Sequence, residues 1–249
     1  MKNSLIQWPR AKYWTTQWNP YIGCTPCSPA CENCYAAAWA QRFGQSFAPH
    51  ETKQKPPRKG VVFCGNMTDL FGEWVPRPGF LVADTRVVQG YPTARNPVYL
   101  WLTKRVSRMV DQIQGISLAG FERSHYFGFT AENQSWYDQR YKDFRKLPTL
   151  WNGWLSAEPL LGAIDLGLQH VYPSEAMPFQ WVVVGCESGP KRRPCKIEWI
   201  ESIVEQCRAF QVPVFVKQIS IGGRCVTDIE KFPEHLQIRQ VPWTTKEEA

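Results

Sequence analysis

The chain has 249 residues, of which 43% are hydrophobic and 20% charged, and its formal net charge is +7. This composition favours a single globular domain over residues 1–249 with a large buried core, and it excludes an intrinsically disordered chain. No apolar run reaches the ~18 residues that cross a bilayer, and the first residues lack a secretory signal, so we expect a cytoplasmic protein.

Short apolar runs rich in β-branched and aromatic residues recur along the chain, which is typical of buried strands. Segments with the apolar spacing of helices lie between several of these runs, and the clearest of them, residues 197–211, has five apolar side chains on one stripe. In chain order, strands are predicted at 13–18, 61–69, 97–105, 125–133, 149–159, 181–189 and 212–218, and helices at 34–44, 106–115, 135–147 and 197–211.

This alternation of strand and helix predicts βα units, a parallel sheet and therefore an α/β fold. About seven units in one domain of this size favour a partial or full (β/α) barrel of the TIM-barrel type over a flat, doubly wound sheet. No glycine-rich phosphate-binding fingerprint follows any predicted strand, so a Rossmann fold lacks its marker.

Polar side chains gather where the predicted strands end. Because the active site of a barrel lies at the carboxyl ends of its strands, we expect these side chains to surround one site. A helix cap or a hydrogen bond within a loop is the alternative for any one of them. The candidates are Asn66, Thr68, Asp69, Thr103, Lys104, Thr130, Glu132, Ser156, Glu158, Glu187, Lys217 and Gln218.

Four of the nine cysteines fall within residues 24–34, just after the first predicted strand. A reducing cytosol keeps thiols free, so this cluster points to a metal rather than to disulfides. Thiolates suit zinc or an iron-sulfur cluster. Only three residues separate the two cysteine pairs, which is short for structural zinc and favours a 4Fe-4S cluster bound by three cysteines. Zinc, or thiols without a metal, is the alternative.

The positive charge is concentrated in the segments 53–60, 140–147 and 191–194. Such segments attract phosphates, although a solvated surface is the simpler interpretation of any one of them. Twelve tryptophans exceed the usual needs of a core, and aromatic rings among basic groups can stack exposed bases. We therefore expect a nucleic-acid or nucleotide substrate, and no membrane partner.

A C-x3-C-x2-C spacing at the start of a barrel, here Cys27, Cys31 and Cys34, resembles the radical S-adenosylmethionine (radical SAM) enzymes. Seven sequence blocks narrow the resemblance to a family of three-cysteine-motif, radical-SAM-like proteins from phages and bacteria. They follow the order of that family across residues 18–218. The blocks are WNPYIGCTPCSPACENCYA, NMTDLFGEWVP, LTKRVSRM, TAENQ, SAEPLLGAIDL, VVVGCESGPKRRP and VPVFVKQ.

In that family the three cysteines are spaced C-x6-C-x2-C, which corresponds to Cys24, Cys31 and Cys34 in this chain. Cys27 is an addition, and with Cys31 and Cys34 it reproduces the spacing of the wider superfamily. We take Cys24 as the third cluster ligand and Cys27 as a spare thiol or an alternative ligand.

The resemblance implies two cofactors, a 4Fe-4S cluster and S-adenosylmethionine, and an external electron donor of the flavodoxin or ferredoxin type. Reductive cleavage of S-adenosylmethionine would give a 5′-deoxyadenosyl radical. A structural ion pair is the alternative role for each charged candidate. By position in the presumed barrel, Asn66, Thr68, Thr130, Glu132, Ser156 and Glu158 would bind the cofactor, and Asp69, Glu187 and Lys217 would bind substrate or move protons.

Such families occur in phage genomes, where bases are chemically altered. The resemblance therefore implies radical modification or rearrangement of a nucleobase, as in DNA hypermodification, within the host cytoplasm if a phage encodes the chain. One alternative is DNA repair resembling that of photoproduct lyase. Another is a non-catalytic, zinc-containing nucleic-acid-binding module, which would be colourless.

Overall fold

The computed structural model describes residues 11–85, 97–114, 116, 124–148, 151–170 and 177–243. The chain divides into two compact units, each assembled from separate stretches. Among the described residues, unit 1 holds 11–13, 130–138, 153–170 and 177–243, and unit 2 holds 14–85, 97–114, 116, 124–129, 139–148 and 151–152. Residues 115, 149 and 150, at the edges of a predicted helix and a predicted strand, lie outside the described part.

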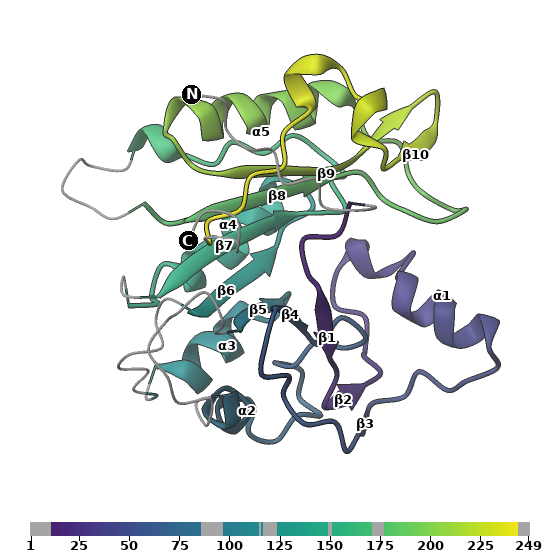
Figure 1. The fold of residues 1–249 in the computed structure, drawn as a ribbon, viewed down its shortest axis with the longest axis vertical. Helices are drawn as coiled ribbons and strands as arrows, with labels where there is room; N and C mark the ends of the chain where they lie inside the picture. The colour runs from purple at the N-terminus through teal and green to yellow at the C-terminus, as the bar shows by residue number, and fades with distance from the viewer. Residues whose placement is uncertain are drawn as a thin grey trace. The chain divides into compact units, whose positions relative to one another are not determined.

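Unit 2 is built on parallel strands in the order β1-β4-β5-β6 (Figure 1). Every residue of β4 is buried, as expected for a parallel strand covered on both faces. The bounds of the strands are β1 Thr16–Trp18, β4 Val61–Cys64, β5 Val98–Thr103 and β6 His125–Thr130, and those of the helices are α1 Tyr35–Arg42, α2 Pro78–Thr85 and α3 Val106–Ile113. Helix α4 (Gln134–Phe144) contributes residues to both units.

A short antiparallel pair in unit 2, β2 (Tyr21–Ile22) with β3 (His50–Glu51), lies next to the cysteine segment. Gly23 follows β2 with a φ of +91°, and a Cβ there would meet the carbonyl oxygen of Ala48 at 2.4 Å. Only glycine fits this left-handed, crowded position. The sequence analysis did not predict this pair, because strands of two residues have no measurable periodicity.

Unit 1 contains the parallel strands β7 (Asn152–Ala157), β8 (Trp181–Gly185) and β9 (Val214–Ile221) and helix α5 (Ile197–Ala209). Strand β10 (Arg224–Val226) runs antiparallel to β9. The tight turn between them is Gly222-Gly223, both with positive φ, and this glycine pair is a hairpin signal that the sequence analysis missed. The 3-10 helices given by the described residues include η2 Pro29–Cys31, η4 Leu168–His170, η5 Ile229–Lys231 and η6 Glu234–Leu236.

Tryptophans fill the interiors of both units. Trp18 and Trp101 meet edge to face at 5.9 Å between ring centroids in unit 2, and Trp154 and Trp181 stack at 5.1 Å in unit 1. All four are fully buried. At these positions tryptophan serves the core, so the number of tryptophans is by itself poor support for base stacking.

The prediction of a mixed α/β fold with mostly parallel strands is confirmed, and all seven predicted strands and four predicted helices are present. Helix α2 was not predicted, since its apolar residues form no clear stripe. Among the described strands β1 pairs only with β4 and β10 only with β9, so these strands form no closed barrel. None of the described helices combines the length and the apolar character that a membrane span needs.

Candidate functional site

The four clustered cysteines lie between β2 and α1, in a segment that we call the cysteine loop and define as residues 24–34. All four side chains are half-buried and carry free thiols. Cys31 closes the 3-10 helix η2, and Cys34 is the N-cap residue of α1. The loop therefore passes directly into a helix, which fixes the position of its last cysteine.

Residues 66–68, which follow β4, hold both ends of the cysteine loop. At the start, the Gly23 amide donates to the Met67 carbonyl at 3.1 Å, and the Thr68 hydroxyl donates to the Gly23 carbonyl at 2.6 Å. At the end, the Tyr35 hydroxyl donates to the Asn66 carbonyl. Asn66 and Thr68, predicted to bind the cofactor, thus position the loop in this structure.

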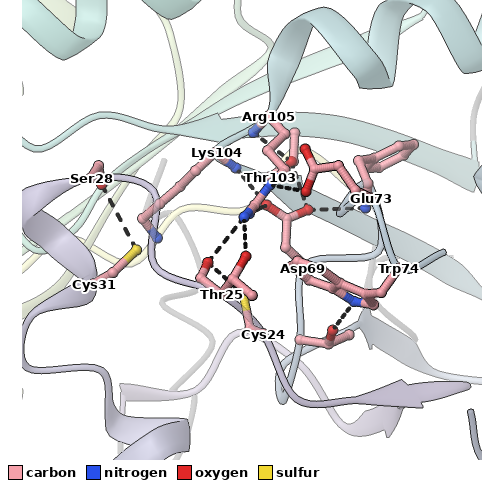
Figure 2. Close-up of polar contacts among 12 residues, drawn as sticks. Cys24, Thr25, Ser28, Cys31, Asp69, Glu73, Trp74, Thr103, Lys104 and Arg105 are labelled. Carbon is pink, nitrogen blue, oxygen red and sulfur yellow. Dashed lines mark hydrogen bonds and ion pairs between the residues drawn. The ribbon is translucent and has the colours of Figure 1, made fainter. Parts of the chain in front are cut away.

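Arg105, two residues after the end of β5, ties the loop to a carboxylate (Figure 2). Its Nη2 donates to the carbonyl and the hydroxyl oxygens of Thr25, both at 3.0 Å, and its Nη1 lies 3.2 Å from Oδ2 of Asp69. Its Nε lies 3.2 Å from Oε2 of Glu73, and the guanidinium stands 4.8 Å from the ring centroid of Trp74. The sequence marks Thr103 and Lys104 at this strand end as site residues, and it does not mark Arg105.

Asp69 accepts hydrogen bonds from four donors. The Thr103 hydroxyl reaches Oδ1 at 2.7 Å and the Phe71 amide reaches it at 3.0 Å, while the Lys104 amide and the Arg105 guanidinium reach Oδ2 at 3.1 and 3.2 Å. A buried carboxylate with this many donors organises the loops around it. Its predicted part in proton transfer stays a prediction.

The thiols of the loop differ in acidity. A hydrogen bond from the Cys27 thiol, with help from the nearby Lys104 ammonium, lowers the pKa of Cys31 to about 4, and the hydroxyl of Ser28 lies 4.0 Å from its sulfur. The same hydrogen bond raises the pKa of Cys27. Burial raises the pKa of Cys24 to about 11. The hydrogen bond between the two sulfurs therefore favours the thiolate of Cys31 and disfavours that of Cys27.

The donor set fits a soft metal, because the loop supplies sulfur ligands and the pKa of one of them, Cys31, is lowered. The structure brings Cys27 next to Cys31. Across the described residues, no three or more Cys, His, Asp or Glu side chains are gathered in a metal-ready group, so Cys24, Cys31 and Cys34 are not brought together in that way.

Two ion pairs in unit 1 contain three of the predicted site residues. Lys217 Nζ lies 2.6 Å from Oε1 of Glu158. The buried Glu187 carboxylate accepts from the Arg193 amide at 2.8 Å, from its Nε at 3.0 Å and also from its Nη2. The structural ion pair, given above as the alternative for charged candidates, is therefore formed at these positions. Arg193 belongs to the basic segment 191–194, and nothing in the sequence marks it as the partner of Glu187.

Three more predicted cofactor residues, Thr130, Glu132 and Ser156, lie almost fully buried in unit 1. The Ala131 amide donates to the Ser156 carbonyl at 3.0 Å, and the Leu161 amide donates to the Glu132 carbonyl at 2.7 Å. Within this unit, the residues 131–132 are thereby held to Ser156 on β7 and to Leu161. Their contact with a cofactor stays a prediction.

A second thiol pair, which the sequence analysis gave no role, occurs beside β9. Cys186 follows β8, and its amide donates to the Gln218 carbonyl at 3.1 Å, whereas Cys225 lies on β10 opposite Ser220. The Cys186 thiol donates a hydrogen bond to the sulfur of Cys225, which lowers the pKa of Cys225 to about 7. The same bond raises the pKa of Cys186.

The comparisons with known proteins give one match. No curated protein and no solved structure matches the chain. A family model described as "Protein of unknown function (DUF5131)" matches residues 3–240. That description assigns no chemistry, so a function has to be argued from the residues themselves. Because the match covers far more than half of the sequence, the chain belongs to the DUF5131 family.

Proposed function

We propose that this protein is a radical SAM enzyme whose cysteine loop holds a 4Fe-4S cluster and which modifies or rearranges a nucleobase. One observation carries the proposal: four thiols within residues 24–34 are held at the end of β4, in a unit built on parallel strands. The proposal includes the finer fold expectation, a partial (β/α) barrel, which the parallel strands and intervening helices of each unit support.

Three cysteines would hold the cluster: Cys24, Cys31 and Cys34, with Cys27 as the alternative to Cys24. A metal binds a thiolate rather than a thiol, and the lowered pKa of Cys31 favours the thiolate. When bound, the cluster and S-adenosylmethionine would supply a 5′-deoxyadenosyl radical, with the electron coming from an external donor of the flavodoxin or ferredoxin type.

The work of the surrounding residues is positioning. Thr68 fixes the main chain before Cys24, and Arg105 fixes Thr25 directly after it. The Lys104 ammonium, which stabilises the Cys31 thiolate, gives this part of the loop a positive neighbour. Asp69 keeps Arg105 in place and balances its charge. These contacts restrict the loop before any ligand binds, which reduces the ordering cost of binding.

The test is the metal content of protein purified without oxygen. We expect a brown protein with about four irons and matching sulfide per chain, which cleaves S-adenosylmethionine to methionine and 5′-deoxyadenosine once a reductant is added. Cys31→Ala and Cys34→Ala should abolish the colour, and comparison of Cys24→Ala with Cys27→Ala identifies the third ligand. Cys225→Ala, outside the loop, is the matched control. One zinc per chain and no colour would refute the proposal.

The substrate class is tested separately with the loaded enzyme. Single-stranded and duplex DNA are incubated with protein, reductant and S-adenosylmethionine. The DNA is then digested to nucleosides, whose masses are measured by mass spectrometry. The proposal expects a new nucleoside mass. If the enzyme instead converts an ultraviolet photoproduct back to the original bases and regenerates S-adenosylmethionine, its reaction is repair and not modification.

A further inference from the structure

Three aromatic side chains form an exposed stripe on α1. Tyr35, Trp39 and Phe43 are 56%, 49% and 57% exposed and follow one another at intervals of four residues, so they lie on one face of the helix and its C-cap. We call these three residues the aromatic stripe. The helix packs through Ala36 and Ala40, its buried residues, which lie on the adjoining face of α1. The helix therefore uses small side chains to pack and leaves its largest ones in solvent.

The rings of the stripe are arranged rather than scattered. Trp39 and Phe43 contact each other at 4.8 Å between centroids with a 50° tilt, and the Arg42 guanidinium lies 6.0 Å from the Phe43 centroid. The Tyr35 hydroxyl donates to the Asn66 carbonyl, so this end of the stripe is anchored to the turn after β4. Leaving large apolar side chains in solvent forgoes the stabilisation that burial would give, and the packing of α1 does not require it.

The chain around the stripe is positive. Residues 32–60 contain five basic side chains and two acidic side chains, Glu32 and Glu51. Besides Arg42, the basic residues are in the segment 53–59, which follows β3, and all of them are exposed: Lys53, Lys55, Arg58 and Lys59. Exposed rings with basic side chains suit a ligand that has flat faces and a negative backbone.

We propose that the aromatic stripe, together with Arg42 and the basic residues of 53–59, is a binding platform for single-stranded nucleic acid. The rings stack on unpaired bases and the basic groups meet phosphates. A duplex is a poorer ligand, because its bases are already stacked inside. A protein partner is disfavoured, since the stripe has no aliphatic anchor and the charged side chain against its rings is the basic Arg42.

Binding of nucleic acid to the stripe does not depend on the proposed function, but the use of that binding to present a substrate base rests on it. The stripe begins at Tyr35, the residue after Cys34, so a strand held on it is presented next to the cysteine loop. It makes the substrate class specific: an unpaired base within DNA or RNA, rather than a free nucleotide.

The experiment measures binding of the full chain to a fluorescent, mixed-sequence single-stranded DNA of about 12 nucleotides, within the usual site sizes for such proteins. At about 1–3 kcal/mol per stacked base, we expect the double variant Trp39→Ala, Phe43→Ala to bind at least tenfold more weakly. Trp39→Phe should stay within about threefold of the wild type, because it keeps a stacking ring. Phe210→Ala, which removes a 37%-exposed aromatic from the end of α5, is the control and should change nothing.

Salt dependence separates the two kinds of contact. Lys53→Ala with Lys55→Ala should reduce the slope of log affinity against log salt, whereas the ring variant should weaken binding with an unchanged slope. Equal affinity of the ring variant and the wild type would overturn the platform. So would equal binding of the duplex, or a wild-type dimer that the ring variant dissociates.

These outcomes are independent of the metal test, because oligonucleotide binding needs neither cluster nor S-adenosylmethionine. Loss of binding in the ring variant of a colourless protein would support the platform and refute the radical enzyme. A brown protein that cleaves S-adenosylmethionine, with unaltered binding in the ring variant, would support the radical enzyme and refute the platform.

Discussion

Arg105 donates two hydrogen bonds to Thr25, one to its carbonyl oxygen and one to its hydroxyl, across a separation of 80 residues. The end of β5 is thereby connected to the residue that follows Cys24. The same guanidinium is paired with Asp69. The position of Cys24 therefore depends on the Asp69 carboxylate, which acts on the cysteine loop through Arg105.

The first prediction concerns this carboxylate. Asp69→Asn leaves the Arg105 charge without its buried partner, and both side chains are only about a tenth exposed. We expect the free energy of unfolding to fall by about 2–4 kcal/mol, measured by urea denaturation. Asp143→Asn, which breaks the more exposed pair with Lys146, is the control and should cost less than about 1 kcal/mol. Similar losses in both variants would contradict the role given to Asp69.

The second prediction compares two glycines with positive φ. Gly23→Ala places a Cβ 2.4 Å from the Ala48 carbonyl oxygen, whereas Gly44→Ala meets nothing within 4 Å. Gly44→Ala should therefore cost only the left-handed strain, about 1–2 kcal/mol. Gly23→Ala should cost clearly more and release the start of the cysteine loop. Thermal unfolding with hydrogen exchange at residues 21–24 checks this, and equal losses would argue against the crowding.

The third prediction is a pH dependence. The pKa of Cys225 is lowered to about 7 by the hydrogen bond from Cys186, so its thiolate fraction rises as pH increases through about 7. The rate of iodoacetamide labelling at Cys225, followed by mass spectrometry, should be half-maximal near that pH, below the ~8.5 of an ordinary thiol. Cys186→Ala removes the donor and should move the midpoint upward. A midpoint unchanged by this substitution would show that the thiol pair is not formed.

The fourth prediction distinguishes two ion pairs in unit 1. The side chains of Glu158 and Lys217 are mostly buried, while those of Asp228 and Lys231 are exposed. A double-mutant cycle with Glu158→Gln and Lys217→Met should give a coupling of about 1–3 kcal/mol. The same cycle at Asp228 and Lys231 should give less than about 0.5 kcal/mol. No difference between the two cycles would mean that Lys217 is not held by Glu158.

Periodicity and burial made the fold class predictable. Strands such as β4 and β8 are continuous apolar runs because they are covered on both faces, and α5 has its apolar residues on one stripe. Strand β10 depends on a Gly-Gly turn of positive φ, which local chemistry marks but periodicity does not. Helix α2 and the β2–β3 pair give no pattern of that kind.

The residue types of the candidate site could be predicted from the sequence, but most of their contacts could not. The thiols at 24–34 and the polar strand ends are visible in the sequence, but their partners come from distant segments. Arg105 reaches Thr25, and Arg193 closes on Glu187, through loop conformations that no local pattern encodes. Sequence reasoning therefore gave Asp69 and Glu187 chemical roles at positions where the structure gives each a guanidinium partner.

The division of the chain has a consequence for its synthesis. Unit 2 uses residues 14–129 but also residues 139–152, and unit 1 takes up residues 130–138 in between. The described part of unit 2 therefore cannot be complete before residue 152 has left the ribosome, more than a hundred residues after the cysteines of the loop. Neither unit can be excised by a single cleavage, and a nascent chain that stalls in β6 leaves both interiors incomplete and open to aggregation.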